Sequence, residues 1–290
     1  MERKMTTRLK YQMALPVFFL IICFIVSVSY AGEEGRLYIV GMGPAGPDLT
    51  APRALAIIEK ADVILCSPGK PKKFERFGKS IDPKKVAFNP WEGIYDEKAK
   101  KLKKTNYKKW LQQVEQQTKK VQDFALQQIK DGKTVVMMDG GDPCVYGPSL
   151  HRLLNGFDDR YFEVIPGMSA FNAASAALKR TMTGENTKFV MLTAPSSLFG
   201  DSYEKGDEIL GDISKYETTM VFYMALSSID KLVEKFKKYY PPELPMAVVY
   251  YAGYSEKEQV LRSTLGTILD DLKKVDEKWI GLLIIGECAK

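Results

Sequence analysis

Short apolar segments that run straight into glycine turns are the feature that most limits what this chain can fold into. Three segments have this form: "RLYIVGMG" from Arg36, "KTVVMMDGG" from Lys133 and "YFEVIPG" from Tyr161. Apolar runs of this length are typical of buried strands. Longer segments with helical spacing separate them, and strands that alternate with helices predict an α/β protein.

Two helices are predicted between these strands. The first covers 52–61, where Pro52 suits a first-turn position. The second covers 107–130, and Asp131-Gly132 ends it. Its apolar residues recur at helical spacing: Leu111, Val114, Val121, Phe124, Ala125 and Ile129.

The chain is predicted to hold two α/β domains after an N-terminal segment. Composition changes near 181–187, and the alternation of strands and helices then begins again. We therefore expect one domain with the glycine-rich loops over 32–185 and a second domain over 186–290.

Residues 1–31 differ from the rest of the chain. Basic residues precede the apolar run "MALPVFFLIICFIVSV" over 13–28, and Ser29 and Ala31 supply the small residues of a cleavage site. This pattern predicts a secretory signal peptide or an uncleaved membrane anchor. The expected location is therefore outside the cytoplasm, in the periplasm, or on the cytoplasmic membrane.

Composition excludes several kinds of chemistry. The chain of 290 residues has a net charge of +6, part of it in the N-terminal segment, so nucleic acid is not indicated as a partner. His151 is the only histidine, and the cysteines show no CxxC spacing, so no metal site is expected. Lysine-rich runs at 69–85 and 98–110 fit either a solvated helix face or attraction of an acidic ligand.

The first glycine turn matches the dinucleotide fingerprint only in its letters. Gly41, Gly43 and Gly46 have the required spacing. A dinucleotide fold needs the third glycine to open a helix, and here the helix is expected only from Pro52. The strand over 62–67 also ends in Cys66-Ser67, without the acidic residue that binds a ribose.

Two later turns have similar chemistry. Gly140, Gly141 and Asp142 follow the strand that begins near Lys133, and Ser169 is predicted to cap the alanine-rich helix. Glycines let a ligand approach the backbone closely. Three such turns at the carboxyl ends of strands predict one ligand crevice.

Taken in order, several segments resemble the tetrapyrrole (corrin/porphyrin) methylase family. They are "VGMGPAGPDLTAPRALAIIEKADVILCS", "GGDPCVYG", "PGMSAFNAASAAL", "MVFYM", "PMAVVYYAG", "STLGTI" and "LLIIGE". The resemblance covers the chain from Arg36 to its C-terminus. It implies two α/β domains with S-adenosylmethionine in the cleft between them, a homodimer, and methyl transfer to a carbon of a porphyrin or corrin precursor.

The resemblance also implies which residues contact the cofactor. They are Pro44, Gly140, Gly141, Asp142, Val145, Ser169, Ala170, Met224 and Ala252. Gly46 stands where the family usually has an aspartate, which leaves Asp48 as the candidate for substrate contact. No catalytic side chain is assigned, because methyl transfer from a sulfonium needs alignment rather than an activated group.

Two other functions are consistent with the same residues. One is a membrane-tethered or periplasmic protein that keeps the fold and binds a tetrapyrrole without methylating it. The other is a methyltransferase whose acceptor is a modified histidine of a translation factor or ribosomal RNA, as in relatives of the family. The modest charge argues against RNA.

Overall fold

A five-stranded parallel sheet forms the first domain. The computed structural model describes residues 35–75, 80–184, 187–199 and 206–290, so the predicted signal or anchor at 1–31 lies outside the described residues. The strand order is β3-β2-β4-β1-β5. The strands are β1 (Arg36–Gly41), β2 (Val63–Leu65), β3 (Val86–Phe88), β4 (Thr134–Asp139) and β5 (Phe162–Ile165). Because all the pairings are parallel, the five carboxyl ends meet at one edge.

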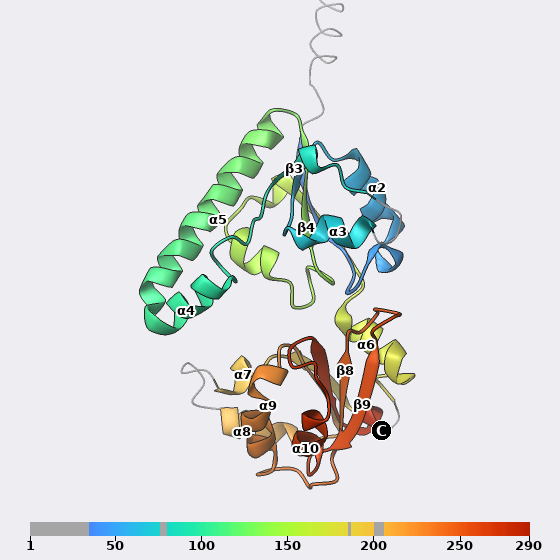
Figure 1. The fold of residues 1–290 in the computed structure, drawn as a ribbon. Helices are drawn as coiled ribbons and strands as arrows, with labels where there is room; N and C mark the ends of the chain where they lie inside the picture. The colour runs from blue at the N-terminus through green and yellow to red at the C-terminus, as the bar shows by residue number, and fades with distance from the viewer. Residues whose placement is uncertain (1–34, 76–79, 185–186, 200–205) are drawn as a thin grey trace, which may run out of the picture.

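Helices cover both faces of this sheet (Figure 1). They are α2 (Pro52–Lys60), α3 (Gly69–Glu75), α4 (Glu97–Thr105) and α5 (Tyr107–Lys130). Side chains of β4 alternate between the faces: Val135 and Met137 pack with α5, whereas Val136 and Met138 pack with α2 and α3. The parallel sheet is therefore buried on both sides, as its uninterrupted apolar strands require.

The helices predicted at 52–61 and 107–130 are both confirmed, each within a residue. Helix α5 buries one stripe along its length, from Trp110 to Ile129. Asn106 caps its start by accepting a hydrogen bond from the Lys109 amide, at 3.0 Å. Gly132, at φ +75°, follows its end.

The second sheet is mixed, with strand order β6-β7-β10-β8-β9. Its strands are β6 (Phe189–Thr193), β7 (Thr218–Phe222), β8 (Pro245–Tyr250), β9 (Gln259–Thr264) and β10 (Gly281–Ile285). Only β6 and β7 are parallel, and β10 runs antiparallel between β7 and β8. The carboxyl ends of β7 and β8 therefore lie beside the start of β10.

Two helical layers enclose this second sheet. One layer contains α7 (Ser196–Phe199), α8 (Gly206–Ile213), α9 (Ile229–Phe236) and α10 (Ile268–Lys273). Helix α6 (Ala170–Leu178), which directly follows the first sheet in sequence, packs on the opposite face. Within the described ranges no helix is both long and apolar enough to cross a bilayer.

Candidate cofactor cleft

The loops that follow β1, β4 and β5 lie directly against one another. The amides of Gly43 and Gly141 each donate to the other's carbonyl, at 3.1 and 2.9 Å. A Cβ on Gly41 would lie 2.5 Å from the backbone nitrogen of Gly167. No side chain fits between these loops, so glycine is required for their contact. The structure thus brings the three predicted turns together at one edge of the first sheet.

The first loop reaches the second domain. Pro44 and Leu49 both lie beside Gly253, where a Cβ would be 3.1 Å from Pro44 Cγ. The Thr50 hydroxyl donates to the Met42 carbonyl, at 2.7 Å, and closes the loop. A short 3-10 helix, η1 (Pro47–Leu49), separates Gly46 from α2, so the glycine does not open a long helix. Asp48 is exposed on η1.

The second loop exposes its backbone. Gly140 is exposed, and Gly141 has φ +72°. Asp142 accepts a hydrogen bond from the Cys144 amide, at 2.8 Å, which shapes the turn leading to Val145. A Cβ on Gly140 would lie 3.2 Å from Nζ of Lys70. The lysine-rich run at 69–85 therefore contributes one cation, Lys70, to this edge. The sequence indicated the run as a whole but not this lysine.

Ser169 connects the third loop to the second domain. It caps α6, as predicted, by accepting from the Phe171 amide at 3.2 Å. Its hydroxyl also lies 2.8 Å from the hydroxyl of Tyr223, which follows β7. Burial raises the pKa of Tyr223, and the Ser169 bond acts in the opposite direction. Tyr146 stacks on the Tyr223 ring, with centroids 4.7 Å apart, so two loops of the first domain meet one side chain of the second.

Loops of the second domain face these turns. Met224 directly follows Tyr223; it has φ +56°, and 65% of its surface is exposed. Ala252 follows β8 and is buried, and Gly253 next to it contacts the first loop. Met224 and Ala252, predicted from separate strands, thus lie along the sheet edge that meets the first domain.

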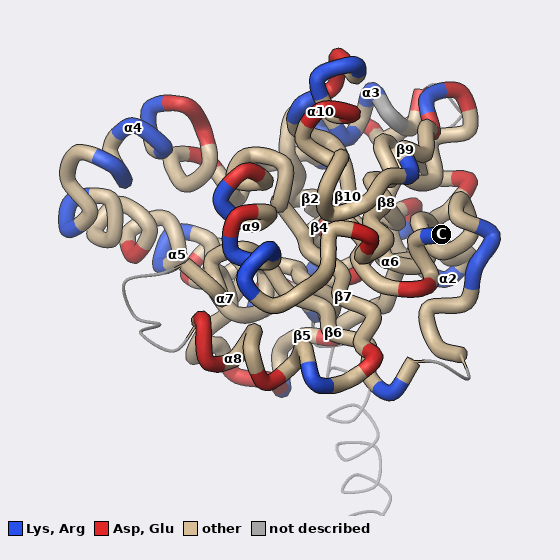
Figure 2. The backbone as a smooth tube through the Cα atoms, turned by 90° about the horizontal axis from the view of Figure 1, so that it is seen from below, with Lys and Arg blue, Asp and Glu red and all other residues tan. Residues whose placement is uncertain are grey.

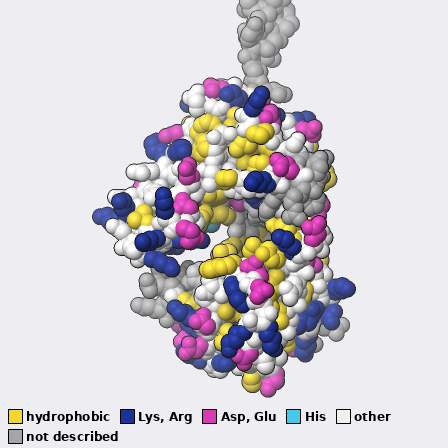
Figure 3. All heavy atoms as spheres, in the orientation of Figure 1, with side chains coloured by type: hydrophobic (Ala, Val, Ile, Leu, Met, Phe, Trp, Pro, Cys, Tyr) yellow, Lys and Arg dark blue, Asp and Glu magenta, His cyan; other side chains and the backbone are white. Residues whose placement is uncertain are grey.

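Large exposed apolar side chains gather at the two facing edges. Each of the following lies in a segment that follows or precedes a strand at these edges: Tyr95, Tyr146, Met168, Met224, Trp279 and Ile280. Figure 3 shows the hollow between the domains, with hydrophobic side chains beneath it. An exposed apolar group of this kind marks a binding surface rather than ordinary solvent contact.

A buried polar cluster lies behind the second loop, and sequence reasoning missed it. Asp139 ends β4 on its α5 face and is only 5% exposed, and its Oδ2 has no hydrogen-bond partner. Ser149 Oγ and Arg152 Nε are also buried without partners. Burial raises the pKa of Tyr95, whereas Arg152 lowers it and Asp139 raises it further. The alternation of β4 could have placed Asp139 on this face, but the convergence with Tyr95 depends on tertiary structure.

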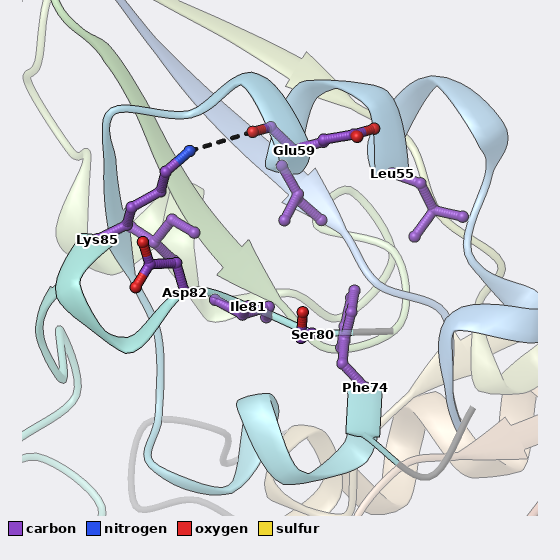
Figure 4. Close-up of a pocket in the computed structure, with 9 residues that line it drawn as sticks. Leu55, Glu59, Phe74, Ser80, Ile81, Asp82 and Lys85 are labelled. Carbon is purple, nitrogen blue, oxygen red and sulfur yellow. Dashed lines mark hydrogen bonds between the residues drawn. The ribbon is translucent and has the colours of Figure 1, made fainter. Parts of the chain in front are cut away.

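A separate cavity of about 440 Å³ lies on the α2 side of the first sheet (Figure 4). Its described lining residues come from α2, β2, α3 and the segment before β3, and none belongs to the glycine loops. Lys85 Nζ donates to the Glu59 carbonyl across one end, at 3.2 Å. The cavity therefore forms no part of the cleft.

Fold and site together define a two-domain α/β protein whose ligand cleft is lined by glycine turns of one sheet and strand ends of another. The chain belongs to the tetrapyrrole (corrin/porphyrin) methylases, whose sequence profile matches residues 36–269. The family predicted from the ordered motifs is thereby confirmed, as is the two-domain α/β fold.

Individual relatives agree with this assignment. The chain is 30% identical over 259 residues to cobalt-precorrin-4 C(11)-methyltransferase of Methanocaldococcus jannaschii, covering 87% of each chain. It is 26% identical to the uroporphyrinogen-III C-methyltransferase of the same organism, covering 87% of this chain and 96% of the relative.

Solved structures share the fold. A cobalt precorrin-4 methyltransferase superposes with a TM-score of 0.66 at 23% identity, covering 89% of this chain and 98% of the other. Uroporphyrin-III C-methyltransferase from Thermus thermophilus, in complex with S-adenosylhomocysteine, superposes with a TM-score of 0.59 at 19% identity, covering 88% and 98%.

Proposed function

We propose that this protein transfers a methyl group from S-adenosylmethionine to a carbon of a tetrapyrrole. The convergence of three glycine turns with the loops after β7 and β8, in a chain 30% identical to a C-methyltransferase, carries the proposal. The proposed cofactor contacts are the predicted set: Pro44, Gly140, Gly141, Asp142, Val145, Ser169, Ala170, Met224 and Ala252. Asp48 remains the proposed substrate contact.

The residues present suit this cofactor. Gly140 and Gly141 leave the backbone of the second loop open, and exposed backbone groups can hydrogen-bond a nucleoside. Met224 offers a polarisable apolar surface for an adenine ring. When bound, the cofactor supplies a methyl group on a sulfonium. The protein's own contribution is to hold donor and acceptor carbon in line and to exclude water.

The cleft also suits a large, ring-shaped acceptor that is rich in carboxylates. Its exposed aromatic and methionine side chains can cover a macrocycle, and basic residues gather along α4 at one side of the hollow (Figures 2 and 3). Positive charge at the entrance attracts an acidic substrate. A porphyrin or corrin precursor has both properties.

Calorimetric titration of the full chain with S-adenosylhomocysteine tests the cofactor assignment. We expect saturable binding that is lost when Asp142→Ala and Met224→Ala are combined. Ile209→Ala, an exposed apolar residue of α8, is the matched control and should bind normally. Absence of binding by the folded wild-type protein would refute the assignment.

A turnover assay distinguishes the enzyme from a protein that only binds tetrapyrroles. Incubation with S-adenosylmethionine and uroporphyrinogen III should release S-adenosylhomocysteine and give a methylated product detected by mass spectrometry. Cofactor binding without turnover would favour the alternative function, a protein that binds tetrapyrroles without methylating them. The export pattern at 1–31 supports that alternative.

We further propose that the protein is a homodimer and that residues 1–31 export it or anchor it to the membrane. Light scattering measures the mass of the assembly. Cell fractionation with sequencing of the mature N-terminus tests export: cleavage after Ala31 supports a signal peptide, and an intact terminus in the membrane fraction supports an anchor. A full-length protein in the cytoplasmic fraction would refute both.

A further inference from the structure

Trp279 is held in an exposed position by a well-ordered turn. At 70% exposure it is the most exposed large apolar side chain among the described residues. The Glu277 carboxylate accepts hydrogen bonds from the Trp279 and Ile280 amides, at 2.6 and 3.0 Å, and from the Tyr251 hydroxyl. These hydrogen bonds hold the backbone of the turn in a conformation that keeps the Trp279 side chain exposed.

The position of the turn places Trp279 at the cleft. Gly281 pairs with Tyr250, so the residues before it lie at the edge of the second sheet that meets the first domain. Strand β10 lies between β7 and β8, which puts the turn between Met224 and the loop that contains Ala252. The Tyr251 amide donates to the Ile280 carbonyl at 3.3 Å and joins the turn to that loop.

The strand that follows the turn packs one of its faces on α9 and α10. Leu283 and Ile285 pack with α9 and α10, and a Cβ on Gly281 would contact Leu226 on the same face. Trp279 lies in the bend that precedes this strand, and exposed Met224 lies just past the end of the neighbouring strand β7. The turn that carries Trp279 and the residue Met224 therefore lie at the same edge of the second sheet.

We propose that Trp279 stacks on the macrocycle of the tetrapyrrole substrate and that Glu277 is the residue that positions it. The inference rests on the proposed function and extends it to a specific substrate contact. The pyrrole rings of a tetrapyrrole offer an indole planar surfaces for stacking, and aromatic stacking adds to the gain from apolar burial. A preorganised turn reduces the ordering cost of binding.

Affinity for uroporphyrin, a stable octacarboxylic tetrapyrrole, tests the proposal in the full-length protein. Trp279→Ala should weaken uroporphyrin binding about tenfold or more, as loss of an anchoring tryptophan does, and raise KM for the tetrapyrrole more than it lowers kcat. Trp279→Phe should restore part of the affinity. S-adenosylhomocysteine binding should not change. Tyr216→Ala, an exposed aromatic before the opposite end of β7, is the matched control and should leave both affinities unchanged.

A double-mutant cycle tests the role of Glu277. Glu277→Ala frees the turn and should raise the uroporphyrin Kd while Trp279 is present, but add little to Trp279→Ala, because both act through one side chain. Additive losses would overturn the positioning role. Unchanged uroporphyrin affinity in Trp279→Ala, alone or with a change in assembly mass that marks a subunit contact, would overturn the stacking role.

The wild-type controls separate this inference from the proposed function. Wild-type protein that binds S-adenosylhomocysteine but not uroporphyrin would overturn the inference and leave the cofactor assignment standing. Wild-type protein that binds neither would overturn both.

Discussion

The contact between the glycine loops leads to a stability prediction at Gly41. An added Cβ would lie 2.5 and 2.7 Å from the backbone nitrogen and Cα of Gly167 and 2.8 Å from Cδ of Pro143. Since Cβ atoms do not approach other atoms within 3.0 Å, the loops must separate by about 0.5 Å. Backbone and a proline ring cannot rotate out of the way.

The cost of Gly41→Ala follows from these contacts. Overpacking of this kind costs about 1–3 kcal/mol, and the lower entropy of the unfolded chain returns about 0.4–1 kcal/mol. We therefore expect a net loss of roughly 1–2 kcal/mol, which lowers Tm by roughly 2–8 °C in a protein of this size. S-adenosylhomocysteine affinity should fall as well, because the displaced loops form the proposed site.

Differential scanning calorimetry and calorimetric titration measure both effects. Gly69→Ala is the matched control: a Cβ there meets nothing within 4 Å, and Gly69 begins α3. Alanine should stabilise that position by about 0.5–1 kcal/mol. A Gly41→Ala protein with wild-type Tm and wild-type cofactor affinity would show that the loops have no close contact.

Four other substitutions test separate parts of the site. Tyr223→Phe removes the hydrogen bond between the domains and should lower the free energy of unfolding in urea by about 1 kcal/mol. Asp139→Asn removes a buried carboxylate with an unpaired oxygen and should leave stability unchanged or raise it by about 1 kcal/mol; a loss above that size would indicate an ionic partner. Hydrogen bonds, first from the Tyr251 hydroxyl, lower the pKa of Glu277 from 4.5 to about 2, so its contribution is complete above pH 4.5 and is lost as the pH falls toward 2. Glu277→Gln should flatten that part of the stability profile. Met224→Gly relieves a left-handed backbone and should weaken cofactor binding without loss of stability, whereas Lys179→Gly, also left-handed, should leave cofactor binding intact.

Much of the fold follows from the sequence because its signals are local. Helix α5 has one apolar stripe over 24 residues, and α2 starts at a proline. The glycine turns are recognisable because each directly follows a short apolar run, and runs of this length are typical of buried strands. Their mutual contact follows from parallel strands, whose carboxyl ends share an edge.

Other parts of the site have no local signal. Tyr95 reaches the cleft because three side chains of α5 hold its loop: the Trp110 indole donates to the Ile94 carbonyl at 3.3 Å, Gln113 to Gly93 at 2.6 Å, and Gln117 to Pro90 at 3.2 Å. In the sequence, the two glutamines look like ordinary polar residues between the apolar residues of a helix, so nothing there indicates that they hold a loop. The sequence likewise gives no sign that Trp279 lies at the cleft, because its position depends on the pairing of β10 between β7 and β8.

Backbone strain marks the same cleft independently of its apolar surface. Four described residues other than glycine have positive φ, and one of them, Lys179, ends α6, where this conformation is common. The other three, Tyr146, Met224 and Tyr251, lie in the loops that follow β4, β7 and β8. Each costs about 1–2 kcal/mol that glycine would avoid, and strained residues concentrate at functional sites. Two of the three, Tyr146 and Met224, are also among the exposed apolar side chains of the cleft, which agrees with the ligand site proposed there.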